Sequence, residues 1–289
     1  MLYVIFNPVS GHGRSKQVLP EVCSLLAERE LQYTVLESNY AGHVIELIQS
    51  LTLSPEDPLV VLGGDGTLFE VVNGLEDRCA RLIPVPCGTG NDFIKTLHLP
   101  KEPIQALTLQ LDGETKPLDV VKLNDYACLN VAGTGFDIDV LRQTEKFKAR
   151  FSGLLAYLLG LIQAIRFYKP LDAKIQIDEE HFEKKLTLIS IANGQYFGGG
   201  MHVAPDASPF DGKLDVIVID AVKKWQICFL LPFFVLGKAN IFPFVHIYRA
   251  SRLKIESADM YVNLDGEIKP IDCADIRISP GMLQAYADQ

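Results

Sequence analysis

A run of apolar, strand-like residues breaks abruptly into glycines near residue 63 and then continues with a helical pattern. The letters are VVLGGDGTLF, in which the glycines Gly63, Gly64 and Gly66 surround Asp65. A strand that ends in glycines before a helix begins lets backbone N–H groups approach a phosphate, and the helix N-terminus adds a favourable dipole. This segment therefore favours a fold in which strands and helices alternate.

The first 120 residues repeat that alternation, because short β-rich runs are separated by amphipathic runs of ordinary helix length. The pattern predicts βαβ units and a Rossmann-like α/β domain with a parallel sheet, whose site lies at the carboxyl ends of the strands. We expect strands at residues 3–6, 34–37, 59–62 and 82–85, and helices at 16–29, 43–51 and 68–75.

The pattern changes near residue 117 to short strands separated by Gly, Pro, Asn and Asp turns. This is typical of a mostly antiparallel β-sandwich, so we predict an α/β domain of residues 1–120 and a β-rich domain of residues 121–279. Residues 280–289 are expected to return to the first domain. The strands are expected at 118–123, 127–131, 173–177, 187–192, 214–219, 252–257, 260–264 and 276–279, and the helices at 138–147, 153–167 and 225–236.

Composition excludes several classes of protein. A chain of 289 residues with 48% hydrophobic residues is too apolar for a disordered protein, and its net charge of −9 argues against a nucleic-acid partner. Six scattered cysteines without a Cys-x-x-Cys pair indicate reduced thiols in the cytoplasm. The longest apolar run, residues 227–237, is shorter than the roughly 20 residues needed to cross a bilayer.

An aromatic-rich stretch at residues 225–244 has two interpretations. It contains Trp225, Phe229 and Phe233, and Lys223 and Lys224 directly precede it. A helix in an apolar core is the favoured interpretation, since most apolar helices are buried. A helix that lies in a lipid interface would have the same composition.

Two further loops follow predicted strands. The letters CGTGNDF occupy residues 87–93, before a predicted helix, and NPVSGHG occupies residues 7–13, after the first strand. Loops at the ends of neighbouring parallel strands can line one nucleotide cleft. Each loop alone is also compatible with an ordinary turn.

Together, and in this order, the three strings resemble the diacylglycerol kinase catalytic domain superfamily, specifically the soluble bacterial lipid kinases. The resemblance continues through NGQYFGGGM at residues 193–201, APDA at 204–207, DGKLDV at 211–216 and DGE at 265–267, so it covers essentially the whole chain. It implies an NAD-kinase-like parallel sheet in the first domain and a cleft for ATP between the domains.

The resemblance also implies a nucleotide site. Ser38 stands where relatives usually carry Thr, which keeps the hydroxyl group. The implied residues are Asn7, Pro8, Val9, Ser10, Gly11, Ser38, Gly63, Gly64, Asp65, Gly66, Thr67, Leu68, Phe69, Thr89, Asn91 and Asp92.

A structural Mg²⁺ is implied at the turn that contains Ser208, Asp211 and Lys213. The first and last of these residues would contribute backbone carbonyl groups. Asp119 matches an aspartate that reaches the surroundings of this ion through water.

Three carboxylates are the candidate catalytic groups. Phosphoryl transfer requires positioned phosphates and a carboxylate that orients or deprotonates the attacking hydroxyl. Asp65 meets this need in the first domain, and Asp265 and Glu267 share one turn in the second. Similar proteins use the Glu of this turn as proton acceptor, which assigns Asp265 to positioning or metal binding. Without the other motifs, Asp-Gly would be read as an ordinary hairpin turn.

The resemblance therefore predicts an ATP- and Mg²⁺-dependent lipid kinase that phosphorylates a lipid hydroxyl, with diacylglycerol as the expected acceptor and phosphatidic acid as the product. Such an enzyme would be cytoplasmic and peripheral to the inner face of the membrane, and a homodimer is compatible with it. Two alternatives remain open. One is an NAD kinase, which shares the Gly-Gly-Asp-Gly loop, and the other is an inactive regulator that binds nucleotide or lipid.

Overall fold

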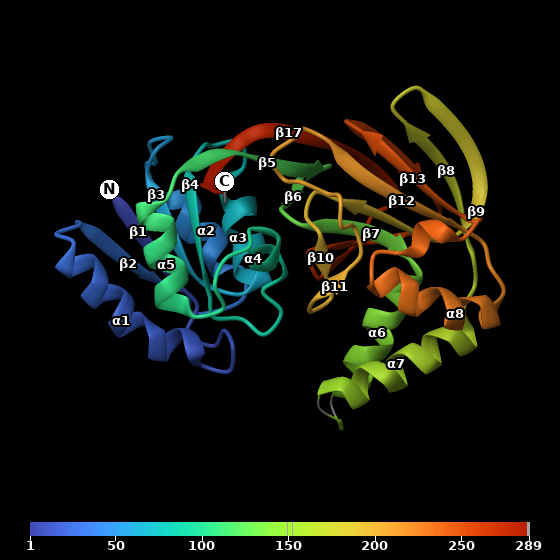
Figure 1. Ribbon diagram of the computed structural model, residues 1–289, viewed down its shortest axis with the longest axis horizontal. Helices are drawn as coiled ribbons and strands as arrows, with labels where there is room; N and C mark the ends of the chain where they lie inside the picture. Colours follow the sequence, from blue (N-terminus) through green and yellow to red (C-terminus); the bar gives the residue numbers. More distant parts are fainter. Residues whose placement is uncertain (149, 152, 288–289) are drawn as a thin grey trace.

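The computed structural model describes residues 1–148, 150–151 and 153–287. Figure 1 shows an α/β half, coloured blue to cyan, beside a β-rich half that carries three helices along its lower side. One mixed sheet of 15 strands runs through both halves. The predicted fold class, a parallel α/β unit followed by a β-rich unit, is confirmed.

The first half contains the predicted parallel sheet, with strand order β2-β1-β3-β4. Its helices lie within a few residues of the predicted ones, except for α5, which the periodicity did not predict. The strands are β1 (Leu2–Phe6), β2 (Tyr33–Glu37), β3 (Pro58–Gly63) and β4 (Arg81–Pro86), and the helices are α1 (Arg14–Glu28), α2 (His43–Ser50), α3 (Asp65–Leu75), α4 (Asp92–Thr96) and α5 (Pro103–Asp112).

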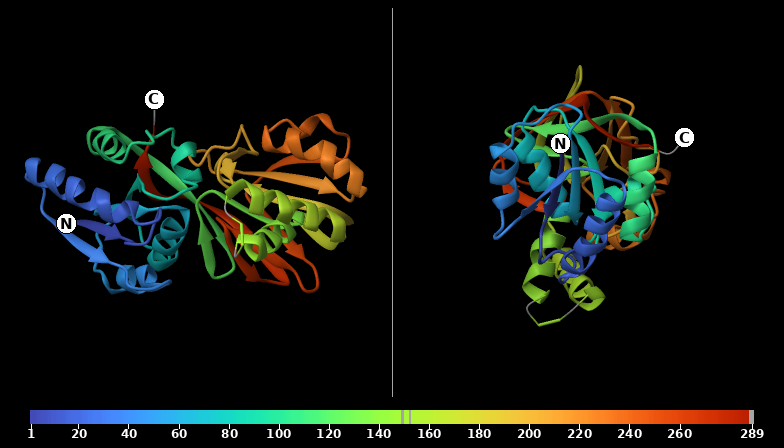
Figure 2. Two further views of the ribbon diagram at one scale, coloured as in Figure 1. Left: turned by 90° about the horizontal axis from the view of Figure 1, so that it is seen from below. Right: turned by 90° about the vertical axis from the view of Figure 1, so that its left-hand side faces the viewer.

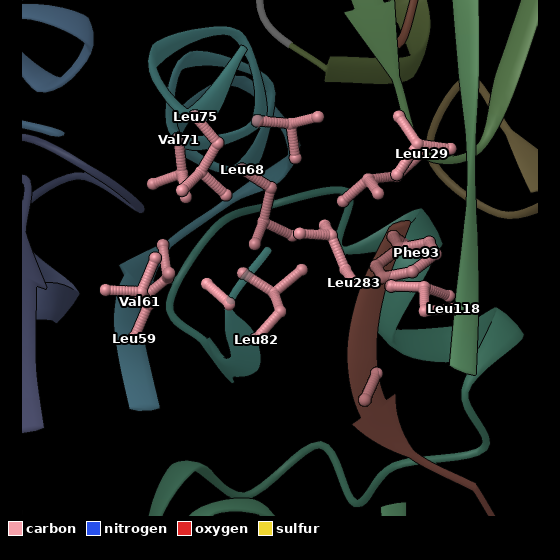
Figure 3. Packing of buried hydrophobic residues seen from close by; sticks show 14 of the residues in the cluster. Leu59, Val61, Leu68, Val71, Leu75, Leu82, Phe93, Leu118, Leu129 and Leu283 are labelled. Carbon is pink, nitrogen blue, oxygen red and sulfur yellow. The ribbon is translucent and has the colours of Figure 1, made fainter. Parts of the chain in front are cut away.

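Side chains from distant parts of the chain fill the core beside this sheet. Figure 3 shows leucines and valines of β3, β4 and α3 packed together, with Phe93 near Leu118, Leu129 and Leu283. All the residues labelled there are at most 3% exposed. Because Leu129 and Leu283 belong to the second half of the molecule, the apolar core extends across the junction and fixes the two halves against each other.

The second half is mostly antiparallel, as predicted. One predicted strand, at residues 127–131, is wrong, because β6 ends at Cys128 and β7 begins at Val131. The strands are β5 (Thr115–Leu123), β6 (Tyr126–Cys128), β7 (Val131–Gly135), β8 (Leu171–Ile177), β9 (Glu180–Ala192), β10 (Tyr196–Phe197), β11 (Met201–His202), β12 (Leu214–Asp220), β13 (Val245–Ala250), β14 (Arg252–Glu256), β15 (Tyr261–Leu264), β16 (Glu267–Pro270) and β17 (Cys273–Tyr286).

Two long strands, β5 and β17, connect the halves. They pair antiparallel along their lengths, with a register shift between Ser279 and Leu283. The end of β17 also pairs parallel with β4, at Gln284 and Ala285, so the chain returns to the first half. Residue 120, the predicted domain boundary, lies inside β5. Residues 288 and 289 of the predicted returning segment lie outside the described residues.

Three helices of the second half lie on one side of the molecule, which Figure 2 (left) views directly. They are α6 (Phe136–Lys148), α7 (Gly153–Phe167) and α8 (Lys224–Val235). The prediction of a buried helix is confirmed for only one face of α8. Ile227 and Leu230 are buried, whereas Trp225 and Phe229 are 60% and 64% exposed. In the part of the chain described here, no helix has the length and apolar character of a membrane span.

Candidate active site

The three glycine-rich loops meet at the carboxyl ends of β1, β3 and β4. Asn7 Nδ2 donates to Thr67 Oγ1 at 3.4 Å, which joins the first loop to the second. Gly64 and Gly88 lie so close that a Cβ on Gly64 would be 2.9 Å from the Cα of Gly88. Gly11, with a φ of +59°, presses against the carbonyl of Cys87. Only glycine permits these approaches, so the loops form one continuous surface.

Asp65 stands at the start of α3 and holds the third loop in place. Its Oδ1 accepts hydrogen bonds from the backbone N–H groups of Asp92 (2.8 Å) and Phe93 (3.3 Å), at the N-terminus of α4. Burial, with a smaller effect of the nearby Asp92 carboxylate, raises the pKa of Asp65 to about 6. A Cβ on Gly90 would lie 2.8 Å from Asp65 Oδ2. The glycine therefore leaves room for this carboxylate.

Asp92 connects the two halves of the molecule. Its Oδ2 accepts from the backbone N–H of Gly199 at 2.7 Å, and its Oδ1 pairs with Lys95 Nζ at 3.0 Å. Gly199 belongs to the loop between β10 and β11 in the second half. The contact places the glycine loop of residues 198–200 directly opposite the nucleotide loops.

Asp265 approaches from the second half, in a left-handed turn with a φ of 51°. Its carboxylate accepts three backbone hydrogen bonds, from Leu129 (2.7 Å), Asn130 (3.1 Å) and Val131 (2.9 Å). These bonds replace strand pairing at residues 129 and 130, which explains the break between β6 and β7. Burial raises the pKa of Asp265 to about 7, and the negative charge of Asp65 contributes to this shift.

A cavity of about 190 Å³ lies between the halves, and we call it the carboxylate cavity. Its walls include Asp65, Asp92 and Asp265, together with Asn130 and Asn263. Two of the three predicted catalytic carboxylates, Asp65 and Asp265, therefore share one space. A carboxylate-lined cavity at the strand ends can orient a hydroxyl group and accept its proton.

Glu267 is not among the residues that line this cavity. It begins β16, its side chain is exposed, and its Oε2 lies 3.6 Å from Lys269 Nζ. The turn that it shares with Asp265 places it beside the cavity. Its role as base remains a prediction.

The other predicted nucleotide residues lie in different environments. Ser38 follows β2 and is buried, with its N–H donating to the carbonyl of Phe6 at 2.9 Å, whereas Val9 is 77% exposed. Leu68 and Phe69 are packed into the core. The remaining residues lie on the three loops or on the strand and helix ends that border them: Asn7, Pro8, Val9, Ser10, Gly11, Gly63, Gly64, Gly66, Thr67, Thr89 and Asn91.

The four predicted metal residues come together around one turn, and none of them lines the carboxylate cavity. Asp119 accepts from the N–H groups of Gly212 (2.6 Å) and Gly281 (2.8 Å). Asp211 pairs with the Arg249 guanidinium and accepts from the N–H of Lys213 at 3.0 Å.

Through these contacts, the carboxylates of Asp119 and Asp211 both have partners within the protein. Ser208 lies beside them at the start of the turn. Among the residues described here, no group of three or more His, Cys, Asp or Glu side chains could hold a metal ion. The side chains at this turn therefore do not by themselves fit a magnesium site, which would require main-chain carbonyl groups.

A second cavity, of about 420 Å³, opens beside the first, and we call it the apolar cavity. The helices α6, α7 and α8 contribute most of its wall, and its lining is mainly apolar. Thr89 of the third loop also lines it. Both cavities share the wall formed by Leu141, Phe197, Gly198 and Gly199.

Sequence reasoning missed Asn130 and Asn263, which line the carboxylate cavity. Asn263 lies two residues before Asp265, and the alternation of side chains along a strand would have placed both on one face. For Asn130, the sequence offered one indication, a single amide side chain within an apolar run of residues. Its buried side chain bonds to Thr96 Oγ1 at 3.0 Å.

The parallel sheet, the joined glycine loops and the β-rich second half define a kinase of the NAD-kinase-like fold class. Two family descriptions match the chain: "Diacylglycerol kinase catalytic domain" over residues 1–123 and "YegS C-terminal NAD kinase beta sandwich-like domain" over residues 130–287. The chain therefore belongs to the diacylglycerol kinase-like lipid kinase family.

Similar proteins agree with this assignment. A diacylglycerol kinase of Staphylococcus epidermidis is 29% identical over 267 residues, which cover 91% of this chain and 84% of that protein. A diacylglycerol kinase of Bacillus subtilis is 28% identical over 268 residues, covering 91% and 88%. The crystal structure of a diacylglycerol kinase from Bacillus anthracis superposes with a TM-score of 0.80 at 27% identity, over 99% of this chain and 96% of that one.

Proposed function

We propose that this chain transfers the γ-phosphoryl group of ATP to the hydroxyl group of a lipid, with diacylglycerol as the acceptor and phosphatidic acid as the product. The observation that carries the proposal is that the carboxylate cavity and the apolar cavity share a wall. An acceptor with a hydroxyl at one end and an apolar tail matches that pairing. A dinucleotide such as NAD has no apolar tail for the second cavity, which argues against the NAD kinase alternative.

The three glycine loops are suited to hold the phosphates of ATP. Glycines allow backbone N–H groups to come close, and α3 directs its N-terminus toward the same space. Magnesium that enters with the nucleotide would neutralise phosphate charge, and Asp65 is a carboxylate of the first half that could face it. The residues of the turn around Asp211 take no part in the proposed transfer.

In the proposed transfer, the acceptor oxygen forms a bond to the γ-phosphorus while the bond from that phosphorus to the β-phosphate oxygen of ATP breaks. ADP leaves with the electron pair, and the acceptor proton passes to a carboxylate. We assign that proton to Glu267, since Asp265 already accepts three backbone hydrogen bonds that fix the turn. Asp265 would then position Glu267 and orient the hydroxyl.

The enzyme would meet its acceptor at a membrane surface. We define the α7–α8 face as the exposed apolar side chains of α7, α8 and the turn after α8. Lys223, Lys224 and Lys238 lie beside it, and these cations suit anionic lipid headgroups. The face consists of Leu155, Leu158, Ile162, Phe167, Trp225, Phe229, Phe233, Leu236 and Ile241.

The test is the incorporation of phosphate from ATP into 1,2-dioctanoylglycerol in mixed micelles, with NAD as an alternative acceptor and Asp65→Ala as the blank. We expect labelled phosphatidic acid from the wild type and none from the variant. Phosphorylation of NAD instead would support the NAD kinase alternative. A folded wild-type protein that transfers phosphate to neither acceptor would contradict the proposal.

A further inference from the structure

One buried carboxyl group lines the apolar cavity with one of its oxygens unpaired. Asp137 lies in the first turn of α6 and is only 8% exposed. No group among the described residues gives its Oδ1 a hydrogen-bond partner. A buried polar atom without a partner carries a desolvation cost of about 1–3 kcal/mol, so its presence in an apolar wall requires a reason.

The position of Asp137 on α6 directs it toward the cavity. Residues 137, 140, 141 and 144 all line the cavity and follow helical spacing, so they form one face of the helix. Thr144 also has an unpaired hydroxyl, but a Cβ on Gly160 would lie 2.4 Å from it, so close packing of α6 on α7 accounts for its place. The first turn of α6 favours the carboxylate of Asp137, but that position does not provide Oδ1 with a hydrogen-bond partner.

Asn263 connects Asp137 to the carboxylate cavity. Asn263 Nδ2 donates to Asp137 Oδ2 at 3.5 Å, and Asn263 Oδ1 accepts from the N–H of Gly266 at 2.8 Å. Gly266 is the central residue of the turn that carries Asp265 and Glu267. Asp137 therefore lies two hydrogen bonds from the site where the acceptor hydroxyl is expected to react.

The surroundings of Asp137 favour its neutral form. Burial is the largest effect and raises its pKa to about 7, although the backbone N–H groups of Ile138 and Asp137 and the Asn263 amide act in the opposite direction. Because Oδ2 accepts from Asn263, Oδ1 is the oxygen that can carry the proton of the neutral acid. The unpaired atom is then an O–H donor, which requires an acceptor from a bound molecule.

We propose that Asp137 is a specificity-determining residue that donates a hydrogen bond from Oδ1 to an ester carbonyl of the lipid, close to the hydroxyl that receives the phosphoryl group. The inference rests on the proposed function and names the acceptor chemistry: an acylglycerol rather than a long-chain alcohol with no second polar group. The acyl chain would continue along the apolar wall beyond Asp137.

The experiment compares two acceptors of equal chain length, 1,2-dioctanoylglycerol and its ether analogue 1,2-dioctylglycerol. Both present the same hydroxyl, but only the first has ester carbonyls. For the wild type we expect kcat/KM to be about tenfold higher with the ester, which is the effect of one hydrogen bond. Asp137→Leu should reduce that ratio to about one.

Two further variants separate recognition from folding. Asp137→Asn keeps a donor and should retain most of the ester preference. Asp172→Leu makes the same change on β8, outside both cavities, and should keep the wild-type ratio. The ratio of kcat/KM for the two acceptors does not depend on how much of the enzyme is folded.

Equal wild-type rates with both acceptors, or an unchanged ratio in Asp137→Leu, would overturn the assignment of Asp137 while leaving the kinase proposal intact. If Asp137→Leu fails to fold, the wild-type ratio and Asp137→Asn decide the question. Absence of transfer by the wild type to either acceptor would instead overturn the proposed function, and this inference with it.

Discussion

The α7–α8 face predicts a measurable membrane affinity. Ile162 of α7 is 63% exposed, and full burial of an isoleucine side chain is worth about 1.5–3 kcal/mol. Moving its exposed part into lipid would therefore contribute about 1–2 kcal/mol, so Ile162→Ser should weaken the binding of vesicles about tenfold. Since the flanking lysines act electrostatically, high salt should weaken binding further.

The assay is co-sedimentation of the protein with vesicles of phosphatidylglycerol and phosphatidylcholine, without ATP. Ile247→Ser is the matched control, because Ile247 is 51% exposed on β13 and is not part of the α7–α8 face. The control should bind vesicles like the wild type. Equal binding by the two variants would refute the assignment of this face. Phosphate transfer to a short-chain acceptor in solution would stay unaffected, which separates docking from catalysis.

Three further predictions concern the carboxylate cavity. Glu267→Gln should lower kcat by about 10²–10⁴ with little change in the KM for ATP, and unaltered steady-state rates would exclude it as the base. Gly90→Ala should lower kcat/KM, because its methyl group would lie 2.8 Å from Asp65 Oδ2; an unchanged kcat/KM would contradict this reasoning. The raised pKa of Asp265 means that the folded state keeps a proton that the unfolded chain releases, so the free energy of unfolding should fall as pH rises from about 4 to about 7. Asp265→Asn should remove up to about 4 kcal/mol of that fall. If urea titrations give the wild type and the variant the same change of unfolding free energy with pH, the prediction is wrong.

Local patterns in the first half were sufficient to predict its fold. The strand before Gly63 and the helix after it are both present, because apolar runs followed by glycines have few alternative structures. The same local signals placed Asp65 and Asp92 in one site. Their contact, a carboxylate that accepts the N–H of a helix start, follows once neighbouring parallel strands end at one edge.

Local sequence patterns could not predict which strands pair over long distances in the chain. Pro280 and Gly281 indicated the end of a strand after Ser279, yet β17 continues to Tyr286, because the register shift against β5 accommodates both residues. The break between β6 and β7 has a similar origin. Asp265, more than 130 residues away in sequence, supplies the hydrogen-bond partners that a neighbouring strand would otherwise provide.

The composition of α8 is best explained by the two environments that its faces would meet. A helix on the surface of a water-soluble domain usually has a polar outer face, but α8 has Trp225 and Phe229 outside and Leu230 and Phe234 inside. The inner side chains line the apolar cavity. An apolar outer face exposed to water promotes aggregation unless something covers it, and a lipid surface would do so. A lipid acceptor could then pass from the membrane into the cavity around one helix, without exposing its acyl chains to water on the way.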